Sequence, residues 1–157
     1  MERIQAIRDI MNTVTDEIVV SSCGKISREV FFIKDRPENF YVQGSMGATV
    51  PIAIGLSLCK PEKYVVAIVG DGEILMNLGT LVLLSSLQKE KKVKIDLYIL
   101  DNNKYQSTGG QKTVSDYIEF RHLCDCKVIF CADSKKEVSR ISMPHKEIKE
   151  RFMNAIK

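Results

Sequence analysis

Several features that identify membrane, secreted or nucleic-acid-binding proteins are missing from this sequence. No apolar run reaches the roughly 18 residues of a membrane-spanning helix, and the N-terminal stretch MERIQAIRDIMNTV is charged and amphipathic, unlike a signal peptide. The formal net charge is only +3, and the lysines form no basic stripe for a nucleic acid. Five cysteines without framework spacing indicate reduced thiols, so we expect a cytoplasmic protein.

A second domain is also not indicated. The chain has 157 residues, 45% of them hydrophobic, which suits one globular domain over residues 1–157. We find no internal repeat and no low-complexity segment. No Gly-x-Gly-x-x-Gly follows the first apolar strand, which argues against a dinucleotide-binding Rossmann domain.

What the sequence does contain is an alternation of apolar strands and helices. This order predicts an α/β fold with three layers, α/β/α, around a mostly parallel sheet. We expect strands at 17–22, 40–47 (running into a glycine turn), 63–69, 94–100 and 127–131. We expect helices at 4–14, 27–33, 48–59, 73–88 and 115–124, with two more helical stretches after 131.

Two polar motifs follow neighbouring strands of this predicted sheet. In VVAIVGDGEILMN the carboxylate of Asp71 lies between two glycines, and in LDNNKYQSTGGQ the amide of Asn103 follows the next strand. Ligands bind at the carboxyl ends of parallel strands, so both side chains can converge on one point. A carboxylate, an amide oxygen and a backbone carbonyl suit Mg²⁺. The N–H groups of the helix starting near Glu73 suit a diphosphate.

The combined motif resembles the cofactor-binding motif of thiamine diphosphate enzymes. Over residues 17–116 the chain resembles the diphosphate-binding domain of phosphonopyruvate and sulfopyruvate decarboxylases. The Gly-Lys-x-Ser-Arg-Glu, Gly-Ser-Met-Gly and Ser-Thr-Gly-Gly-Gln elements favour this branch. The resemblance implies the thiamine diphosphate-binding fold, the cofactors thiamine diphosphate and Mg²⁺, and a small anionic 2-oxoacid as substrate.

The resemblance also assigns roles to individual residues. It implies that Asp71, Asn103 and the carbonyl of Tyr105 bind Mg²⁺. It implies that Met46 holds the cofactor bent and that the carbonyl of Gly44 accepts a hydrogen bond from the aminopyrimidine. The backbone N–H groups of Gly72 and Glu73 would contact the diphosphate. The complete set of expected cofactor-binding residues is Gly44, Ser45, Met46, Gly70, Asp71, Gly72, Glu73, Asn103 and Tyr105.

Three departures from the family pattern affect the predicted function. The polar stretch after residue 131 lacks the last strand of the family, so we expect the sheet to be one strand short. Glu73 replaces a small residue: a side chain that points away only serves the helix N-terminus, whereas a negative charge facing the diphosphate would lower cofactor affinity. The glutamate that protonates the pyrimidine ring lies on a separate domain in the family, so we expect no certain catalytic residue in this chain. We therefore predict a pyrimidine-binding partner subunit in an α₂β₂-like assembly, with decarboxylase activity only in the complex.

Other interpretations remain open at this point. Two alternative functions are a subunit of an acetolactate synthase-like carboligase and a non-catalytic diphosphate-binding relative of these enzymes. Lys25, Arg28, Lys104 and Lys112 lie in or near motif loops, where they either attract an anionic substrate or are solvated surface residues. A metal site at His122, Cys124, Cys126 and Cys131 is a weaker interpretation than core cysteines, because YIEFRHLC reads as a helix that packs Tyr117, Phe120 and Cys124 inward.

Overall fold

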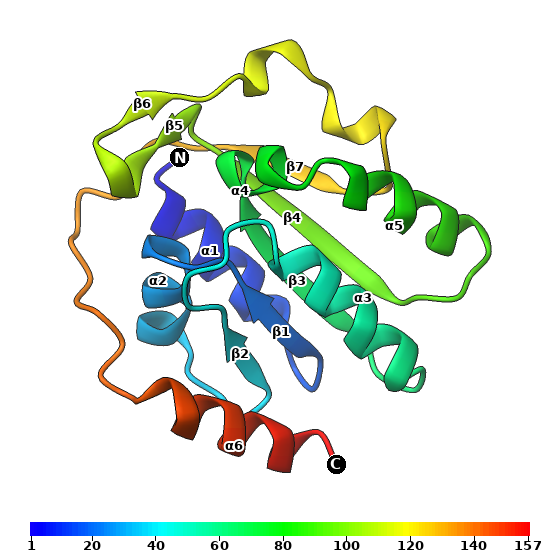
Figure 1. Cartoon of the computed structure of the whole chain (residues 1–157). Helices are drawn as coiled ribbons and strands as arrows, with labels where there is room; N and C mark the ends of the chain where they lie inside the picture. The colour runs from blue at the N-terminus through cyan, green and yellow to red at the C-terminus, as the bar shows by residue number, and fades with distance from the viewer.

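The computed structural model describes all residues, 1–157, and its centre is a five-stranded parallel sheet (Figure 1). The strand order is β2-β1-β3-β4-β7, and a separate two-stranded hairpin, β5-β6, lies beside it. This confirms the predicted three-layer α/β/α class with a sheet of five strands. The strands are β1 (Ile18–Ser21), β2 (Asn39–Tyr41), β3 (Val65–Gly70), β4 (Ile95–Asp101), β5 (Lys104–Tyr105), β6 (Gln111–Lys112) and β7 (Lys127–Phe130).

Helices cover both faces of the sheet. Central strands of a parallel sheet are buried on both sides, and β3 shows this directly. Val65, Ala67 and Val69 point into the core under α3 and α5, while Val66 and Ile68 point into the core under α1 and α2. The helices are α1 (Arg3–Thr13), α2 (Lys25–Ile33), α3 (Thr49–Cys59), α4 (Asp71–Met76), α5 (Gly79–Lys89) and α6 (His145–Ala155), with 3₁₀ turns η1 (Gln106–Thr108), η2 (Ser115–Tyr117) and η3 (Phe120–His122).

The two polar motifs lie at the same edge of the sheet. Strands β3 and β4 are neighbours, and Gly70 is paired with Leu100 at their carboxyl ends. Asp71 follows β3 and Asn103 follows β4, so both residues lie at the same edge of the sheet. This confirms the expectation that the motif loops gather where parallel strands end.

The outer edge of β7 is partly closed by the start of the chain. Glu2 forms a parallel bridge with Ala132, just after β7. The Arg3 N–H donates to the Ala132 carbonyl over 2.9 Å, and the Ala132 N–H donates to the Met1 carbonyl over 2.8 Å. The first three residues thus pair alongside the end of the edge strand.

Helix α6 closes the opposite side of the molecule, next to β2 (Figure 1). The rings of Phe152 and Phe40 lie 5.1 Å apart, and Ile148 and Phe152 are buried. Arg151 donates two hydrogen bonds to the carboxylate of Asp35, of 2.7 and 2.8 Å. No helix in the structure is both long enough and apolar enough to cross a membrane.

Three predicted helical segments were wrong. Residues 115–124 form two 3₁₀ turns, because the backbone of Ile118 between them is extended (φ −137°, ψ 135°), and Tyr117 is 88% exposed rather than packed inward. The expected helix 73–88 is two helices, because Asn77 leaves the helical conformation (φ −145°) and donates to the Gly47 carbonyl over 3.0 Å. After residue 131 there is one helix, α6, instead of two.

Candidate cofactor site

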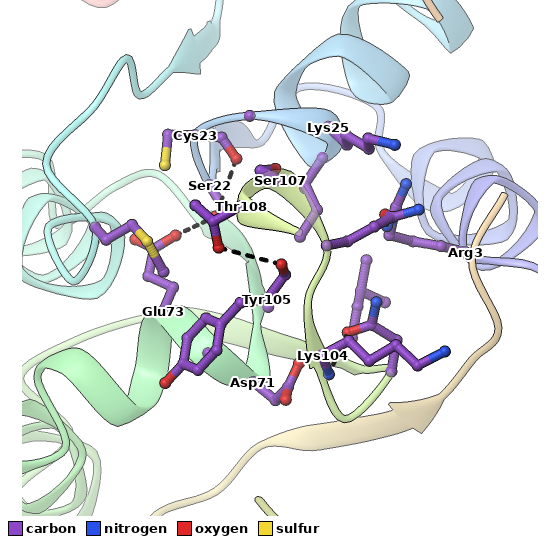
Figure 2. A pocket seen from close by; sticks show the side chains of 18 residues that line it. Arg3, Ser22, Cys23, Lys25, Asp71, Glu73, Lys104, Tyr105, Ser107 and Thr108 are labelled. Carbon is purple, nitrogen blue, oxygen red and sulfur yellow. Dashed lines mark hydrogen bonds between the residues drawn. The ribbon is translucent and has the colours of Figure 1, made fainter. Parts of the chain in front are cut away.

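A cavity of about 140 Å³ opens where β1, β3 and β4 end (Figure 2). Its walls come from the loop after β1, the start of α4 and the β5-β6 hairpin. The loop before α3 contributes Met46, and the N-terminal segment contributes Arg3. The cavity is lined by Arg3, Ser22, Cys23, Gly24, Lys25, Ile26, Met46, Gly70, Asp71, Gly72, Glu73, Leu100, Asn102, Lys104, Tyr105, Gln106, Ser107 and Thr108.

Asp71 is a buried carboxylate without a basic partner. Its side chain is 1% exposed and accepts a hydrogen bond of 2.5 Å from the Thr113 hydroxyl. No lysine, arginine or histidine forms an ion pair with it. Burial raises the pKa of Asp71 above its ordinary value, although the Thr113 hydrogen bond lowers it in part. A cation bound at this carboxylate would remove that penalty.

Asn103 presents an amide oxygen that has no partner in the protein. Its backbone is left-handed (φ 56°), and its Nδ2 donates to the Ser115 hydroxyl over 3.2 Å and to Asp116. These two bonds leave Oδ1 buried and without a hydrogen bond. Buried polar atoms without partners are rare in native proteins and call for an explanation such as an ion.

The hydroxyl groups of Thr113 and Ser115 connect the Asp71 and Asn103 side chains. The two hydroxyls lie 3.1 Å apart, and Ser115 also donates to Asp101 over 3.0 Å. A buried carboxylate and an unsatisfied amide oxygen on one hydroxyl network fit a hard cation such as Mg²⁺. No three histidine, cysteine, aspartate or glutamate side chains lie together in a way that could hold a metal ion, so such a site depends on amide and carbonyl oxygens.

Tyr105 contacts the motif with both its backbone and its ring. Its carbonyl accepts hydrogen bonds from the Gly110 N–H (3.0 Å) and from the Thr108 hydroxyl (3.3 Å), so a metal ion would have to displace one of them. The ring packs directly on Gly72, where an added Cβ would lie 2.5 Å from the ring edge. The second glycine of the motif is therefore required by this close approach.

Glu73 turns its side chain into the structure rather than toward solvent. The carboxylate accepts a hydrogen bond from the Ser22 hydroxyl and another of 3.1 Å from the Thr49 N–H, and the side chain is 3% exposed. It therefore joins the loop after β1 to the first residue of α3; Figure 2 shows the bond to Ser22. Burial, followed by the charge of Glu73, raises the pKa of the neighbouring Cys23 thiol.

Three cationic side chains line the cavity away from Glu73. Arg3 is paired with Glu29 and also donates to the Gln106 side chain. Lys25 and Lys104 have no acidic partner within ion-pair distance. The sequence had marked both lysines as candidates, but nothing in it indicated Arg3, which reaches the cavity only through the tertiary fold.

The structure brings most of the expected cofactor-binding residues together. Met46, Gly70, Asp71, Gly72, Glu73 and Tyr105 line the cavity. Three others do not: Asn103 faces the Ser115 network beside it, Gly44 lines a separate hollow near Arg140, and Ser45 lines no part of it. Pattern reasoning had missed Thr113 and Ser115, which carry no sequence signal of their own.

The fold and the site define a cofactor-binding α/β domain whose polar motifs lie at the carboxyl ends of parallel strands. Residues 22–150 match the model of the family described as thiamine pyrophosphate enzyme, C-terminal TPP binding domain. The chain belongs to this family, which confirms the predicted resemblance and the cofactor that it implies.

Individual relatives agree with this assignment. The chain is 37% identical over 186 aligned positions to the sulfopyruvate decarboxylase subunit beta of Methanococcus maripaludis, covering all of this chain and 98% of that one. It is 36% identical to the phosphonopyruvate decarboxylase of Streptomyces viridochromogenes, over 74% of this chain and 29% of that one. A solved thiamine diphosphate-dependent 4-hydroxybenzoylformate decarboxylase from Rhodococcus jostii shares the fold, with a TM-score of 0.66 and 16% identity, over 85% of this chain and 32% of that one. The chain thus spans about a third of the latter two proteins.

Proposed function

We propose that this chain is the diphosphate-binding subunit of a two-subunit, thiamine diphosphate-dependent 2-oxoacid decarboxylase that acts on sulfopyruvate or phosphonopyruvate. The observation that carries the proposal is the buried pair of Asp71 and the unsatisfied Asn103 Oδ1, found in a chain of this family. Its similarity along almost the whole of a sulfopyruvate decarboxylase subunit beta supports the substrate class and the subunit role.

Within this proposal, Asp71, the amide oxygen of Asn103 and the carbonyl of Tyr105 hold Mg²⁺. Gly72 and Glu73 direct backbone N–H groups toward the diphosphate, with Gly70 leading into the turn. The loop of Gly44, Ser45 and Met46 serves the organic part of the cofactor. When bound, thiamine diphosphate supplies the electron sink for loss of CO₂ from a 2-oxoacid, while the protein supplies orientation and charge.

The metal assignment is tested by titration calorimetry of thiamine diphosphate in the presence of Mg²⁺. Asp71→Ala removes the charged ligand, so binding should fall below detection while the fold is retained. Asn103→Ala should weaken binding less, because a dipole rather than a charge is lost. Asp96→Ala, at an exposed carboxylate on β4, is the matched control and should bind normally. Unchanged binding by the Asp71 variant would refute the site.

We further propose that a pyrimidine-binding partner chain completes the active site. Met46 is 44% exposed beside the cavity, and Met76, also exposed, lies next to Gly47 of the same loop. This apolar surface is the proposed docking face for the partner. The partner would contribute the glutamate that protonates the pyrimidine ring, and an α₂β₂-like assembly would place active sites between unlike chains.

The partner is tested with the isolated chain and with the product of a neighbouring reading frame. The isolated chain should release no CO₂ from any 2-oxoacid, and addition of the companion chain should restore release. Glutamate-to-glutamine substitution in the companion should abolish activity with assembly intact. Robust turnover by the isolated chain would contradict the two-subunit proposal.

The substrate is tested by CO₂ release from sulfopyruvate, phosphonopyruvate and pyruvate side by side. We expect a preference for a 2-oxoacid with a second anionic group, because two unpaired lysines line the cavity. A preference for pyruvate would refute this, and joining of two 2-oxoacids would identify a carboligase instead.

Five free cysteines support the proposed cytoplasmic location.

A further inference from the structure

Apart from Asp71, the proposed metal ligand, the charged side chains of the cavity are separated by sign. In Figure 2, Lys25, Arg3 and Lys104 lie along one side, and Glu73 lies on the other beside Cys23. The charge of Arg3 is balanced by Glu29, so Lys25 and Lys104 carry the free positive charge. The cavity is therefore polar along its length, with a cationic side and an anionic side.

The anionic side lacks a counter-ion within the protein. Glu29 shows how this chain neutralises a buried carboxylate, because Arg3 holds it with two hydrogen bonds of 2.7 and 2.9 Å. Glu73 is equally buried, yet its partners are one hydroxyl and one backbone N–H. A buried charge without an opposite charge is costly, and a cationic ligand group would offset that cost.

We propose that the Glu73 carboxylate is the counter-ion of the cationic thiazolium ring of thiamine diphosphate. The diphosphate would keep its place at Mg²⁺ and at the backbone N–H groups of Gly72 and Glu73, and the ring would lie beside the Glu73 carboxylate. The inference rests on the proposed cofactor and deepens it, because it gives a function to the residue that departs from the family pattern. It differs from both sequence-based expectations for Glu73, which were lower affinity if the charge faces the diphosphate and support of the helix N-terminus if it does not.

The hydrogen bonds of Glu73 show why the side chain keeps this place. Bonds from Ser22 and Thr49 hold the carboxylate between the loop after β1 and the start of α3. The carboxylate is thereby held on the side of the cavity opposite Lys25 and Lys104 (Figure 2). Glu73 acts as a positioning and specificity residue and takes no part in proton transfer.

The test compares two probes on the full chain by titration calorimetry with Mg²⁺. One probe is thiamine diphosphate, and the other is an analogue in which carbon replaces the ring nitrogen, so that the ring is neutral. Glu73→Gln keeps an acceptor for the Thr49 N–H and a hydrogen-bonding group for Ser22, and removes only the charge. We expect it to weaken thiamine diphosphate about tenfold and the neutral analogue less than about twofold. Glu62→Gln, at an exposed position, is the control and should change neither.

The other outcomes are informative in different ways. Equal weakening of both probes would make Glu73 a structural residue and overturn the inference, as would tighter binding of both. In either case intact binding of thiamine diphosphate by the wild-type chain leaves the proposed function standing. Failure of the wild-type chain to bind thiamine diphosphate at all would overturn both. Alkylation of Cys23 provides a second measurement, because loss of the Glu73 charge should lower the pKa of that thiol if the side chain keeps its place.

Discussion

Arg3 and Glu29 form a buried ion pair that joins the first turn of the chain to the second helix. The Arg3 guanidinium donates to both carboxylate oxygens of Glu29 and also to the side chain of Gln106, in the segment that covers the cavity. One arginine therefore connects the N-terminus, α2 and the hairpin of the site. The pair also explains the glutamate of the Gly-Lys-x-Ser-Arg-Glu element, whose partner lies 26 positions earlier.

Removing one member of this pair should be strongly destabilising. Glu29→Gln leaves the Arg3 charge buried without a counter-ion, so the free energy of unfolding should fall by about 3–5 kcal/mol. Urea denaturation measures the change. Asp16→Asn breaks the exposed pair with Lys63 and should leave stability nearly unchanged, which makes it the matched control. Similar losses from both variants would contradict this reading.

Asp71→Asn should stabilise the protein in the absence of metal. The raised pKa of Asp71 means that the native state binds more protons than the unfolded state at pH values above the ordinary 3.8. Stability due to this group is therefore greatest at low pH and is lost as the pH rises toward the native pKa. Thermal unfolding at neutral pH should show a Tm a few degrees higher for the variant, since about 1 kcal/mol moves the Tm of such a domain by about 2–4 °C.

The same variant should fail to respond to ligand. Mg²⁺ with thiamine diphosphate should raise the Tm of the wild-type chain but not that of Asp71→Asn. A variant that is less stable without metal would show that the carboxylate itself, through Thr113, is needed for folding.

Gly72→Ala should disturb the site through Tyr105. The added Cβ would lie 2.5 Å from the tyrosine ring, closer than any ordinary contact. We expect a loss of about 1–3 kcal/mol in unfolding free energy. Tyr105→Ala in the same chain should recover part of that loss. Gly79→Ala is the control, because nothing lies within 4 Å of its added Cβ and alanine favours the helix.

The attachment of α6 should weaken in acid. Burial raises the pKa of Asp35, but hydrogen bonds from Arg151 and Tyr41 lower it more, so the net pKa is below its ordinary value of 3.8. The stabilisation is therefore present above that value and is lost as the pH falls through the lower native pKa. Arg151→Met should remove this acid-dependent part and cost at most about 1 kcal/mol at neutral pH, because the pair is partly exposed. Hydrogen exchange of the α6 amides measures the acid dependence and the loss of stability at neutral pH. If the Arg151→Met variant exchanged like the wild type at both pH values, the Asp35–Arg151 pair would not hold α6 in place.

Pattern reasoning succeeded where local sequence and fold agree. The β-branched runs of β3 and β4 are buried on both faces, so their composition alone indicates central parallel strands. Asp71 and Asn103 come directly after these strands, and the rule for strand ends placed them correctly. Met46 lines the cavity, and its role toward the cofactor stays a prediction from the resemblance of its glycine-rich loop.

Other features depend on contacts between distant segments. Arg3 reads as an ordinary residue of an amphipathic helix, and only the packing of α1 against α2 brings it to Glu29. Residues 115–124 have a helical apolar spacing, but Ser115 is held by Asp101 and Asn103, and the chain there becomes extended. Tertiary hydrogen bonds of this kind override local periodicity.

The bridge between Glu2 and Ala132 has a consequence for protein engineering. Because the pairing is parallel, residues added before Met1 would run beside Phe130, Ile129 and Val128 along the open edge of β7. An extension of four or five β-branched residues should therefore form an additional strand along β7. A purification tag rich in charge or proline at the same place could not pair with β7 in this way. Tags are better attached after Lys157, and a grafted N-terminal strand offers a direct way to widen this sheet.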